Sequence, residues 1–188
     1  MEERTPCSDI DFRIKLLTEA DCDSLAGFVC GVAELDDFFH FEVRQCIAHH
    51  YLAVYCAYLD SNEIVALFTL MNDALMISGQ LEKDDFIDDL RLETPENVAD
   101  FFNRQTSYPA INIGHLGTSI HFQNRGIGTA IIDLVASTYS SFRQAGCQFI
   151  TVDAINRSDT IRFYTDNQFN FQTNRDFYSA TRRMYRII

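Results

Sequence analysis

The sequence predicts an α/β fold, with strands and helices in the order βααββ, an insertion, and then βαβαββ. Three observations support this prediction. Apolar residues recur with a period of two in some segments and with helical spacing in others. The composition, 47% hydrophobic and 22% charged, is typical of a chain that buries a core. The length of 188 residues suits one domain, so we expect a single domain over residues 1–188.

The first elements follow from local patterns. Residues 11–17 alternate as a strand, and Thr18 then begins a helix that has acidic residues in its first turn. Apolar residues at helical spacing predict a second helix over about 34–50. Residues 51–59 and 64–71 are two apolar runs rich in β-forming residues, and the short polar piece between them indicates a hairpin.

The middle of the chain differs in composition. Residues 79–105 hold eight acidic residues against three basic ones. We interpret them as an acidic, partly helical insertion on the surface, at about 79–109, which Pro109 ends. The elements expected after it are, in order, a strand over 110–120, a helix that ends at Gly146, a strand over 148–154, a helix that Ser158 caps and that runs to about Asn167, and strands near 169–174 and 180–187.

Charge is unevenly placed along the chain. The net charge is -12, which disfavours nucleic acid as a partner because phosphate binding depends on Lys and Arg. Residues 1–123 carry a net charge of -15, and residues 124–188 carry a net charge of +3. One interpretation is a chance asymmetry of the surface. The other is a molecule with two ligand faces, the later one suited to an anion and the earlier one to a cation.

Simpler features disfavour other classes of protein. The longest apolar run, 51–59, is far shorter than the ~20 residues of a membrane span. The N-terminal residues lack an apolar stretch behind a positive end, so we expect no secretory signal and a cytoplasmic protein with free thiols. Cys46, His49 and His50 lie within one helical turn, and ligands from a single turn rarely converge on one ion, so no metal is expected.

The turn Gln123-Asn124-Arg125-Gly126-Ile127-Gly128 lies between a predicted strand and a predicted helix. Its glycines let the backbone approach a ligand, and the helix adds unpaired N–H groups and the positive end of its dipole. Arg125 adds a full charge. Together these features indicate a site for a pyrophosphate. A dinucleotide-binding turn is the alternative, but it would need a third glycine at the position of Ile131.

This turn and its surroundings resemble the GCN5-related N-acetyltransferase (GNAT) family. The family signature Gln/Arg-x-x-Gly-x-Gly/Ala corresponds to Gln123–Gly128, with a strand before it and a helix after it. Asn156 and the segment Ile161-Arg162-Phe163-Tyr164, followed by Gln168-Phe169, are similar to later family motifs, although Gln168 replaces the usual glycine. The resemblance covers about residues 10–188. It implies a GNAT fold: a central, mixed, mostly antiparallel twisted sheet flanked by helices.

The early segment Phe28-Val29-Cys30-Gly31-Val32-Ala33-Glu34-Leu35-Asp36-Asp37-Phe38 is similar to one branch of the family, which includes toxins that acetylate aminoacyl-tRNA. Structural roles explain the same residues: Gly31 makes a turn, Phe38 belongs to the core, and Asp36 favours the start of a helix. The acidic net charge argues against the toxin function, since tRNA binding calls for a basic surface.

The resemblance also implies a role for each matched residue. Backbone groups of residues 123–129 would hold the pyrophosphate of acetyl-CoA, those of the preceding strand would pair with the pantetheine arm, and Asn156 would hydrogen-bond the arm near its sulfur. The cofactor-binding residues expected in this way are Leu116, Gly117, Thr118, Gln123, Asn124, Arg125, Gly126, Ile127, Gly128, Thr129 and Asn156. Acetyl-CoA is thus the expected co-substrate.

Tyr164 is expected to act in catalysis, because a phenol with a pKa of about 10 can donate a proton to a leaving thiolate. An amine that is an ammonium at neutral pH must lose a proton before it attacks. The family often uses a Glu or a held water here, but the matching strand offers His115 and Ser119 instead. His115, with an unperturbed pKa of about 6.5, is the expected base, and Asp73 is another candidate.

We therefore expect a single-domain N-acetyltransferase that moves an acetyl group from acetyl-CoA to a primary amine by direct attack. The uneven charge favours a cationic small-molecule or peptide amine. Nucleic acid and membrane are not expected partners, and a homodimer is left open. Two alternatives remain: a GNAT-type toxin that acetylates aminoacyl-tRNA, and a non-catalytic GNAT module that binds CoA.

Overall fold

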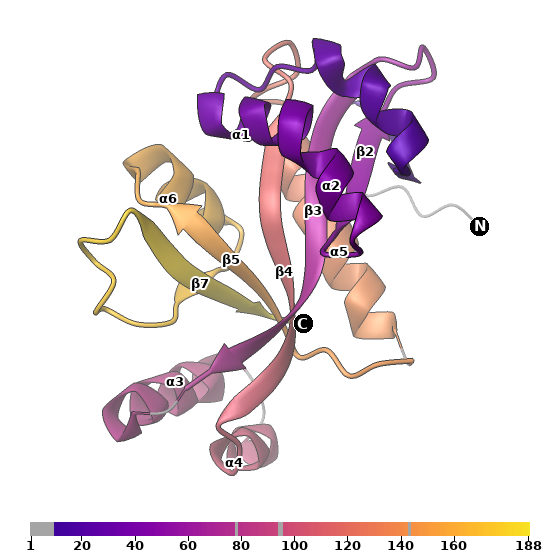
Figure 1. Ribbon diagram of the computed structural model, residues 1–188. Helices are drawn as coiled ribbons and strands as arrows, with labels where there is room; N and C mark the ends of the chain where they lie inside the picture. The colour runs from indigo at the N-terminus through magenta and orange to yellow at the C-terminus, as the bar shows by residue number, and fades with distance from the viewer. Residues whose placement is uncertain (1–9, 78, 94–95, 143) are drawn as a thin grey trace. The chain divides into compact units, whose positions relative to one another are not determined.

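The computed structural model describes residues 10–77, 79–93, 96–142 and 144–188 (Figure 1). Its strands are β1 (Arg13–Leu16), β2 (Ala53–Tyr58), β3 (Ile64–Met76), β4 (Ser107–Thr118), β5 (Phe149–Ile155), β6 (Asn170–Phe171) and β7 (Thr181–Ile187). They form one sheet in the order β1-β2-β3-β4-β5-β7-β6. The β1–β2, β2–β3, β5–β7 and β6–β7 pairs are antiparallel. This arrangement confirms the predicted α/β fold with a mostly antiparallel sheet.

By compactness the chain divides into two units, each built from two separate segments. The first comprises the described residues of 1–72 and 112–138, and the second those of 73–111 and 139–188. Strands β3 and β4 each contribute residues to both units. The expectation of a single domain stays a prediction.

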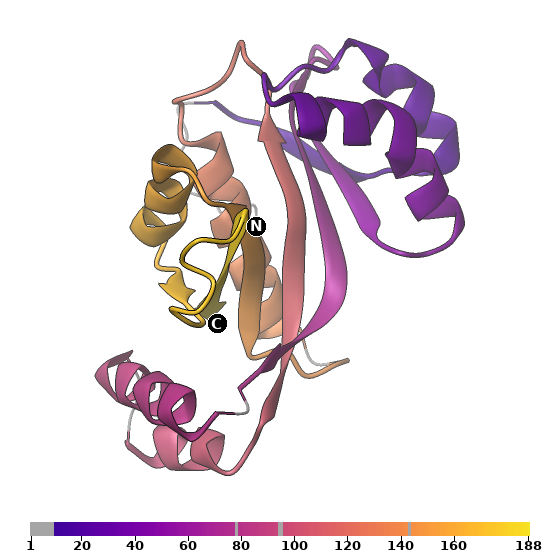
Figure 2. The same cartoon turned by 60° about the vertical axis from the view of Figure 1, so that its left-hand side comes forward.

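In the first unit, helices cover both faces of the strands (Figure 2). The elements on one face are the 3₁₀ helix η1 (Glu19–Gly27), α1 (Ala33–Asp37), the π turn η2 (Phe38–Glu42) and α2 (Val43–Ala48). Helix α5 (Ile127–Ser141), most of which belongs to this unit, lies on the other face. The first group of helices packs a core against β2 and β3 that includes Leu25, Phe39, Val54 and Leu67.

The helix expected over 34–50 is present but is not uniform. Helix α1, the π turn η2 and helix α2 follow one another without a break, so the helical run extends over residues 33–48. A π turn is rare and adds a residue to one turn of a helix, which shifts the phase of the side chains. Here Phe38 and Phe39, two successive residues of that turn, are both buried. Apolar spacing alone predicted a regular helix and missed this change.

The helix expected to begin at Thr18 is a 3₁₀ helix. Thr18 begins it as predicted, because its backbone N–H and its hydroxyl both donate to the carboxylate of Asp21, at 2.8 and 2.7 Å. Lys15 also contacts this carboxylate, at 2.5 Å from Nζ to Oδ1. Asp21 therefore links the end of β1 to the start of η1.

In the second unit, the acidic segment folds as two neighbouring helices, α3 (Gln80–Glu93) and α4 (Glu96–Asn103) (Figure 1). The segment is not confined to the surface, because its apolar side chains pack against aromatic residues of β4, β5 and β7. The buried side chains of this cluster include Phe86, Ile87, Leu90, Phe102, Tyr108, Phe149 and Tyr185. The segment is helical, and its apolar side chains contribute to the core of the second unit. The expectation of an insertion stays a prediction.

Two local predictions in the second unit are wrong. Pro109 does not end the insertion: it lies inside β4, where its carbonyl oxygen accepts the N–H of Gln148 at 2.8 Å. Ser158 does not cap helix α6 (Ser158–Asp166), because Arg157 occupies the N-cap position and Ser158 is the first helical residue. Across both units, no helix in the described ranges is long and apolar enough to span a bilayer.

Candidate functional site

The turn between β4 and α5 has the backbone shape that suits an anion. Asn124 and Gly126 both adopt positive φ angles, of 60° and 76°. Helix α5 begins directly after them, and the N–H of Ala130 donates to the carbonyl oxygen of Gly126 at 2.9 Å. The N–H groups ahead of Ala130 in the first turn have no acceptor within the helix. The exposed Arg125 guanidinium lies 5.6 Å from the centre of the Phe122 ring. These features together fit a bound pyrophosphate.

The side chain of Gln123 has a role that sequence reasoning missed. Its Nε2 donates to the carbonyl oxygen of Cys30 at 2.7 Å and to that of Thr118 at 3.2 Å. The expectation for Gln123 concerned backbone contacts with a ligand. In the structure its amide instead ties the turn to the segment 28–31, which is far away in the sequence.

The segment 28–31 is held by side chains of the following helical run. The carboxylate of Asp36 accepts the N–H groups of Cys30 and Gly31, at 2.7 and 3.2 Å. Burial by itself would raise the pKa of Asp36, but these hydrogen bonds outweigh it and lower that pKa. His40 Nε2 donates to the carbonyl oxygen of Phe28 at 2.7 Å. Asp36 thus does more than favour a helix start: it fixes the turn at Gly31.

Gly31 and Gly117 permit this close packing. Gly31 has a φ of +82°, and a Cβ there would lie 3.3 Å from Cγ2 of Ile120. A Cβ at Gly117, on β4, would lie 3.2 Å from Cβ of Cys30 and 3.4 Å from Cε2 of Phe39. The proposed contact of Leu116, Gly117 and Thr118 with a pantetheine arm stays a prediction. The structure gives Gly117 a packing role.

His115 lies on β4 against the π turn. Its ring stacks on that of Phe38, with centroids 3.6 Å apart and planes within 8°. Its Nδ1 lies 3.1 Å from Oγ1 of Thr69, and its backbone N–H donates to the same oxygen at 3.0 Å. Burial lowers the pKa of His115 below 6.5, so the imidazole is neutral at neutral pH.

Tyr164 lies in α6 and is 8% exposed. Its ring makes edge contacts with Phe163 and Phe169, with centroids 5.1 and 5.3 Å apart. Burial raises the pKa of Tyr164 to about 12, which keeps the phenol protonated at neutral pH. Gln168 has a φ of 66°, so it occupies the left-handed conformation that glycine adopts most readily. Gln168, which stands where the family motif usually has glycine, therefore keeps the left-handed backbone turn before Phe169.

Asn156 makes hydrogen bonds to other residues of the second unit. Its Nδ2 donates to the carbonyl oxygens of Phe177 and Ser179, both at 2.9 Å, and its backbone N–H donates to Ala180 at 2.9 Å. These bonds fix the loop before β7. A contact between Asn156 and the pantetheine arm stays a prediction.

Asp73 is poorly suited to act as a base. Its carboxylate is paired with Arg183 and accepts hydrogen bonds from Thr151 and from the N–H of Ala74. Burial would raise the pKa of Asp73, but these contacts outweigh it and lower that pKa. Arg183 also binds Asp153, at 2.8 Å. The group is therefore a structural ion-pair network.

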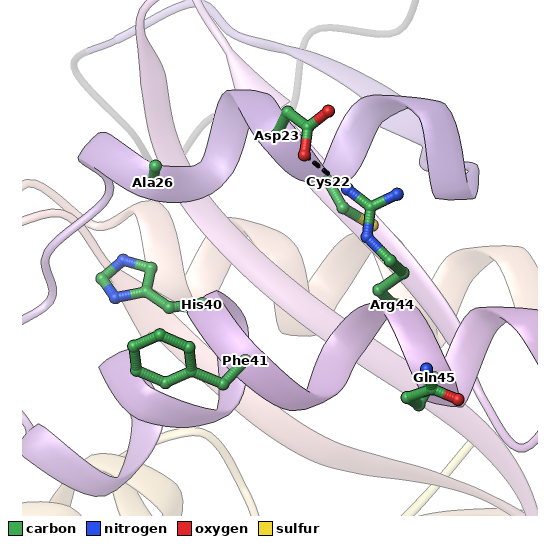
Figure 3. Close-up of a pocket in the computed structure, with 7 residues that line it drawn as sticks. All are labelled: Cys22, Asp23, Ala26, His40, Phe41, Arg44 and Gln45. Atoms are coloured by element: carbon green, nitrogen blue, oxygen red, sulfur yellow. Dashed lines mark hydrogen bonds and ion pairs between the residues drawn. The ribbon is translucent and has the colours of Figure 1, made fainter.

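Two hollows lie in the first unit. One, of about 410 Å³, lies between η1 and the helical run that follows, with His40 and Phe41 at one end and the Arg44–Asp23 ion pair at the other (Figure 3). None of the predicted site residues lines it. A larger one, of about 600 Å³, includes Ser119. Among the described residues, no group of three His, Cys, Asp or Glu side chains is arranged to hold a metal ion.

Among known proteins, the matches to this chain are solved structures with a similar fold. No protein-family model matches the chain, and no curated protein matches it. A tyrosine-to-phenylalanine mutant of the toxin AtaT, bound to the C-terminus of the antitoxin AtaR and to acetyl-CoA, is 16% identical, with a TM-score of 0.66 over 95% of this chain and 94% of its own. AtaT complexed with acetyl-methionyl-tRNAfMet is 17% identical, with a TM-score of 0.67 over 92% and 94%.

A mutant of KacT gives a similar result. It is 14% identical to this chain, with a TM-score of 0.67 over 94% of each chain. At this low identity the structural similarity shows the fold alone, and it extends over nearly all of both chains. The order of strands and the turn before α5 agree with that result. The chain therefore has the fold of the GCN5-related N-acetyltransferases, as its motifs predict.

Proposed function

We propose that this protein is an N-acetyltransferase that moves the acetyl group of acetyl-CoA to a primary amine by direct attack. The observation that carries the proposal is the turn before α5, where Asn124 and Gly126 have positive φ angles and Arg125 is exposed. This backbone shape suits a pyrophosphate at a helix N-terminus. A structure of the same fold holds acetyl-CoA, which supports the choice of co-substrate.

In this proposal the backbone of residues 123–129 binds the pyrophosphate, and Arg125 adds a positive charge. The backbone of Leu116–Thr118 pairs with the pantetheine arm, and Asn156 binds the arm near its sulfur. Acetyl-CoA supplies the activated acetyl group. Gln123 keeps the turn in its binding shape, because its amide is bonded to Cys30 and Thr118.

Tyr164 is proposed as the general acid. The amine nitrogen forms a bond to the acetyl carbon and loses a proton to water, the carbon–sulfur bond breaks, and the Tyr164 hydroxyl gives its proton to the sulfur. Burial raises the pKa of Tyr164 to about 12, so the phenol carries its proton at neutral pH. The tyrosine then regains a proton from solvent.

An aminoacyl-tRNA is the first candidate for the acceptor. One structure of the same fold holds acetyl-methionyl-tRNA, and another is bound to an antitoxin peptide. The early segment 28–38, which is similar to the toxin branch, is an ordered part of the first unit held by Asp36 and His40. These observations favour the toxin alternative over a small amine, and an antitoxin-like protein is then the expected partner.

A cationic amine is the second candidate, and one specific observation favours it. The net charge is -12, and Lys and Arg are the residues that nucleic-acid binding requires. A field of this sign attracts cations and repels a tRNA. A CoA-binding module without catalysis is a third possibility, which differs from both in its lack of turnover.

Thiol release from acetyl-CoA tests the proposal. The purified protein is incubated with acetyl-CoA and, in separate reactions, with charged tRNA, uncharged tRNA or a panel of primary amines. We expect thiol release with charged tRNA and none with uncharged tRNA. Release with the amine panel alone would favour the second candidate. Binding of acetyl-CoA in calorimetry without any release would leave a non-catalytic module, and an absence of binding would overturn the proposal.

A further inference from the structure

The pair of Thr69 and His115 defines which nitrogen of the imidazole carries the proton. Thr69 Oγ1 accepts the backbone N–H of His115 at 3.0 Å and lies 3.1 Å from Nδ1 of the same residue. Thr69 is 1% exposed, so water does not take its hydroxyl proton. In the described part of the chain, this hydroxyl has no acceptor other than Nδ1 of His115.

A buried hydroxyl that cannot donate its proton loses a hydrogen bond, which disfavours that arrangement. Thr69 avoids that loss when its O–H donates to an unprotonated Nδ1. A neutral imidazole carries one proton, and with Nδ1 as the acceptor that proton is on Nε2. The other arrangement, with Nδ1–H donating to Thr69, leaves the buried hydroxyl proton without a partner.

The π turn supports the neutral form. It places the Phe38 ring flat against the imidazole, with centroids 3.6 Å apart. Phe39 contacts the same ring edge-on, with centroids 6.2 Å apart. These aromatic surfaces remove water from the ring, and the pKa of His115 is lowered accordingly. Nδ1 faces Thr69, and His115 as a whole is half-buried.

We propose that Thr69 holds His115 as the neutral Nε2–H tautomer, so that His115 is a hydrogen-bond donor in this protein and not a general base. This inference rests on the proposed acetyl transfer. In that reaction negative charge builds on the acetyl carbonyl oxygen, and a preoriented N–H donor stabilises such charge. His115 Nε2–H donates to that oxygen, and the proton of the attacking amine leaves to water. Thr69 is a positioning residue that acts through His115.

Nitrogen-15 NMR of the wild-type protein tests the tautomer without any need for activity. Long-range proton–nitrogen correlations distinguish protonated from unprotonated ring nitrogens, and the spectrum of His115→Gln assigns the His115 signals. At pH 7.5 we expect Nε2 to be protonated and Nδ1 unprotonated. A protonated Nδ1 at that pH would overturn the inference, whether or not the protein transfers acetyl groups.

Steady-state kinetics test the donor role. A glutamine amide can donate a hydrogen bond but cannot act as a base, so His115→Gln should keep kcat within about tenfold, while His115→Leu should lose about 10²–10³-fold. Equal losses in the two variants, or no loss in either, would refute the donor role. Thr69→Val should lower kcat more than it changes KM, and its NMR spectrum should show a mixture of the two His115 tautomers. Thr69→Ser should restore the wild-type kcat and the single Nε2–H tautomer. If wild type shows no transfer at all, the proposed function fails while the NMR result stands.

Discussion

The side-chain amide of Gln123 donates a 2.7 Å hydrogen bond to the carbonyl oxygen of Cys30, a residue 93 positions earlier in the chain. The bond joins two segments that the sequence suggests for different reasons: the turn proposed for a pyrophosphate and the early segment similar to the toxin branch. Asp36 holds the N–H groups of the same early segment. The shape of the proposed binding turn therefore depends on the packing of residues 28–31.

Removal of the Gln123 amide should loosen both segments. Gln123→Met keeps the length of the side chain and loses its two hydrogen bonds. We expect a loss of about 1–2 kcal/mol in the free energy of unfolding, together with weaker acetyl-CoA binding. Urea unfolding and calorimetry measure the two effects. Gln45→Met, at an exposed position on α2, is the control and should change neither. An unchanged free energy of unfolding in Gln123→Met would show that the two Gln123 hydrogen bonds do not stabilise the protein.

Gly126 should be required for binding of acetyl-CoA. Its φ of 76° is unfavourable for a β-branched residue, and a Cβ would approach the proposed position of the pyrophosphate. We expect Gly126→Val to lose detectable binding in calorimetry. Gly27→Val is a matched control, because a Cβ at Gly27 meets no atom within 4 Å. Wild-type affinity in a folded Gly126→Val protein would remove the turn from the proposal.

The sequence predicts what local patterns determine. The hairpin between β2 and β3 and the turn before α5 follow from short-range signals, and the structure contains both. The packing of the acidic segment is harder to predict, because its apolar residues are recognised as core only when Tyr108 and Phe149 are placed beside them. The π turn, whose Phe38 ring stacks on His115, likewise leaves no periodic trace in the sequence.

In the candidate site, too, the sequence predicts local features and misses contacts between distant residues. The family motif located Gln123, Gly126 and Tyr164 in the sequence. It could not show that Gln123 reaches Cys30, since no local pattern records a contact across 93 residues. The pairing of Asp73 with Arg183, 110 residues apart, was equally hidden, and it explains why the candidate base Asp73 is instead a structural group.

Tyr164→Phe should separate binding from catalysis. The change removes the phenolic proton and keeps the buried ring contacts with Phe163 and Phe169. We expect unchanged acetyl-CoA affinity and a loss of about 10²–10⁴-fold in kcat. Because the pKa of Tyr164 is raised to about 12, its ionisation should not limit kcat between pH 6 and 9. Tyr55→Phe serves as the control. A near-wild-type rate would assign Tyr164 to packing alone.

The Asp73 ion pair should stabilise the protein at neutral pH and not in acid. Asp73→Asn should lower the free energy of unfolding by about 2 kcal/mol at pH 7, because the partly buried Arg183 loses a charged partner. The pKa of Asp73 is lowered in the folded state. Its stabilisation is therefore fully present above the unfolded value of about 3.9 and is lost as pH falls through the folded pKa.

Unfolding curves from pH 7 to pH 2.5 check this sign. The difference between wild type and Asp73→Asn should shrink as the pH falls below about 4. Asp60→Asn is the control, because the Asp60–Arg13 pair is largely exposed and should contribute less than about 1 kcal/mol. A difference that persists unchanged into acid would mean that the Asp73 carboxylate acts through its shape and not its charge.

The acceptor should be revealed by the salt dependence of the reaction. With a net charge of -12, the protein attracts a cationic amine and repels a tRNA at long range. For 1,4-diaminobutane, kcat/KM should fall several-fold as salt rises from ~0.05 to ~0.3 M, because the Debye length falls below ~10 Å. For 4-amino-1-butanol, which lacks the second charge, the fall should be smaller. If the acceptor is an aminoacyl-tRNA, it should react faster than either amine, and added salt should first speed the reaction by screening the repulsion. Equal rates for the two amines at every salt concentration would show that the acidic residues serve as solvated surface and do not select the substrate.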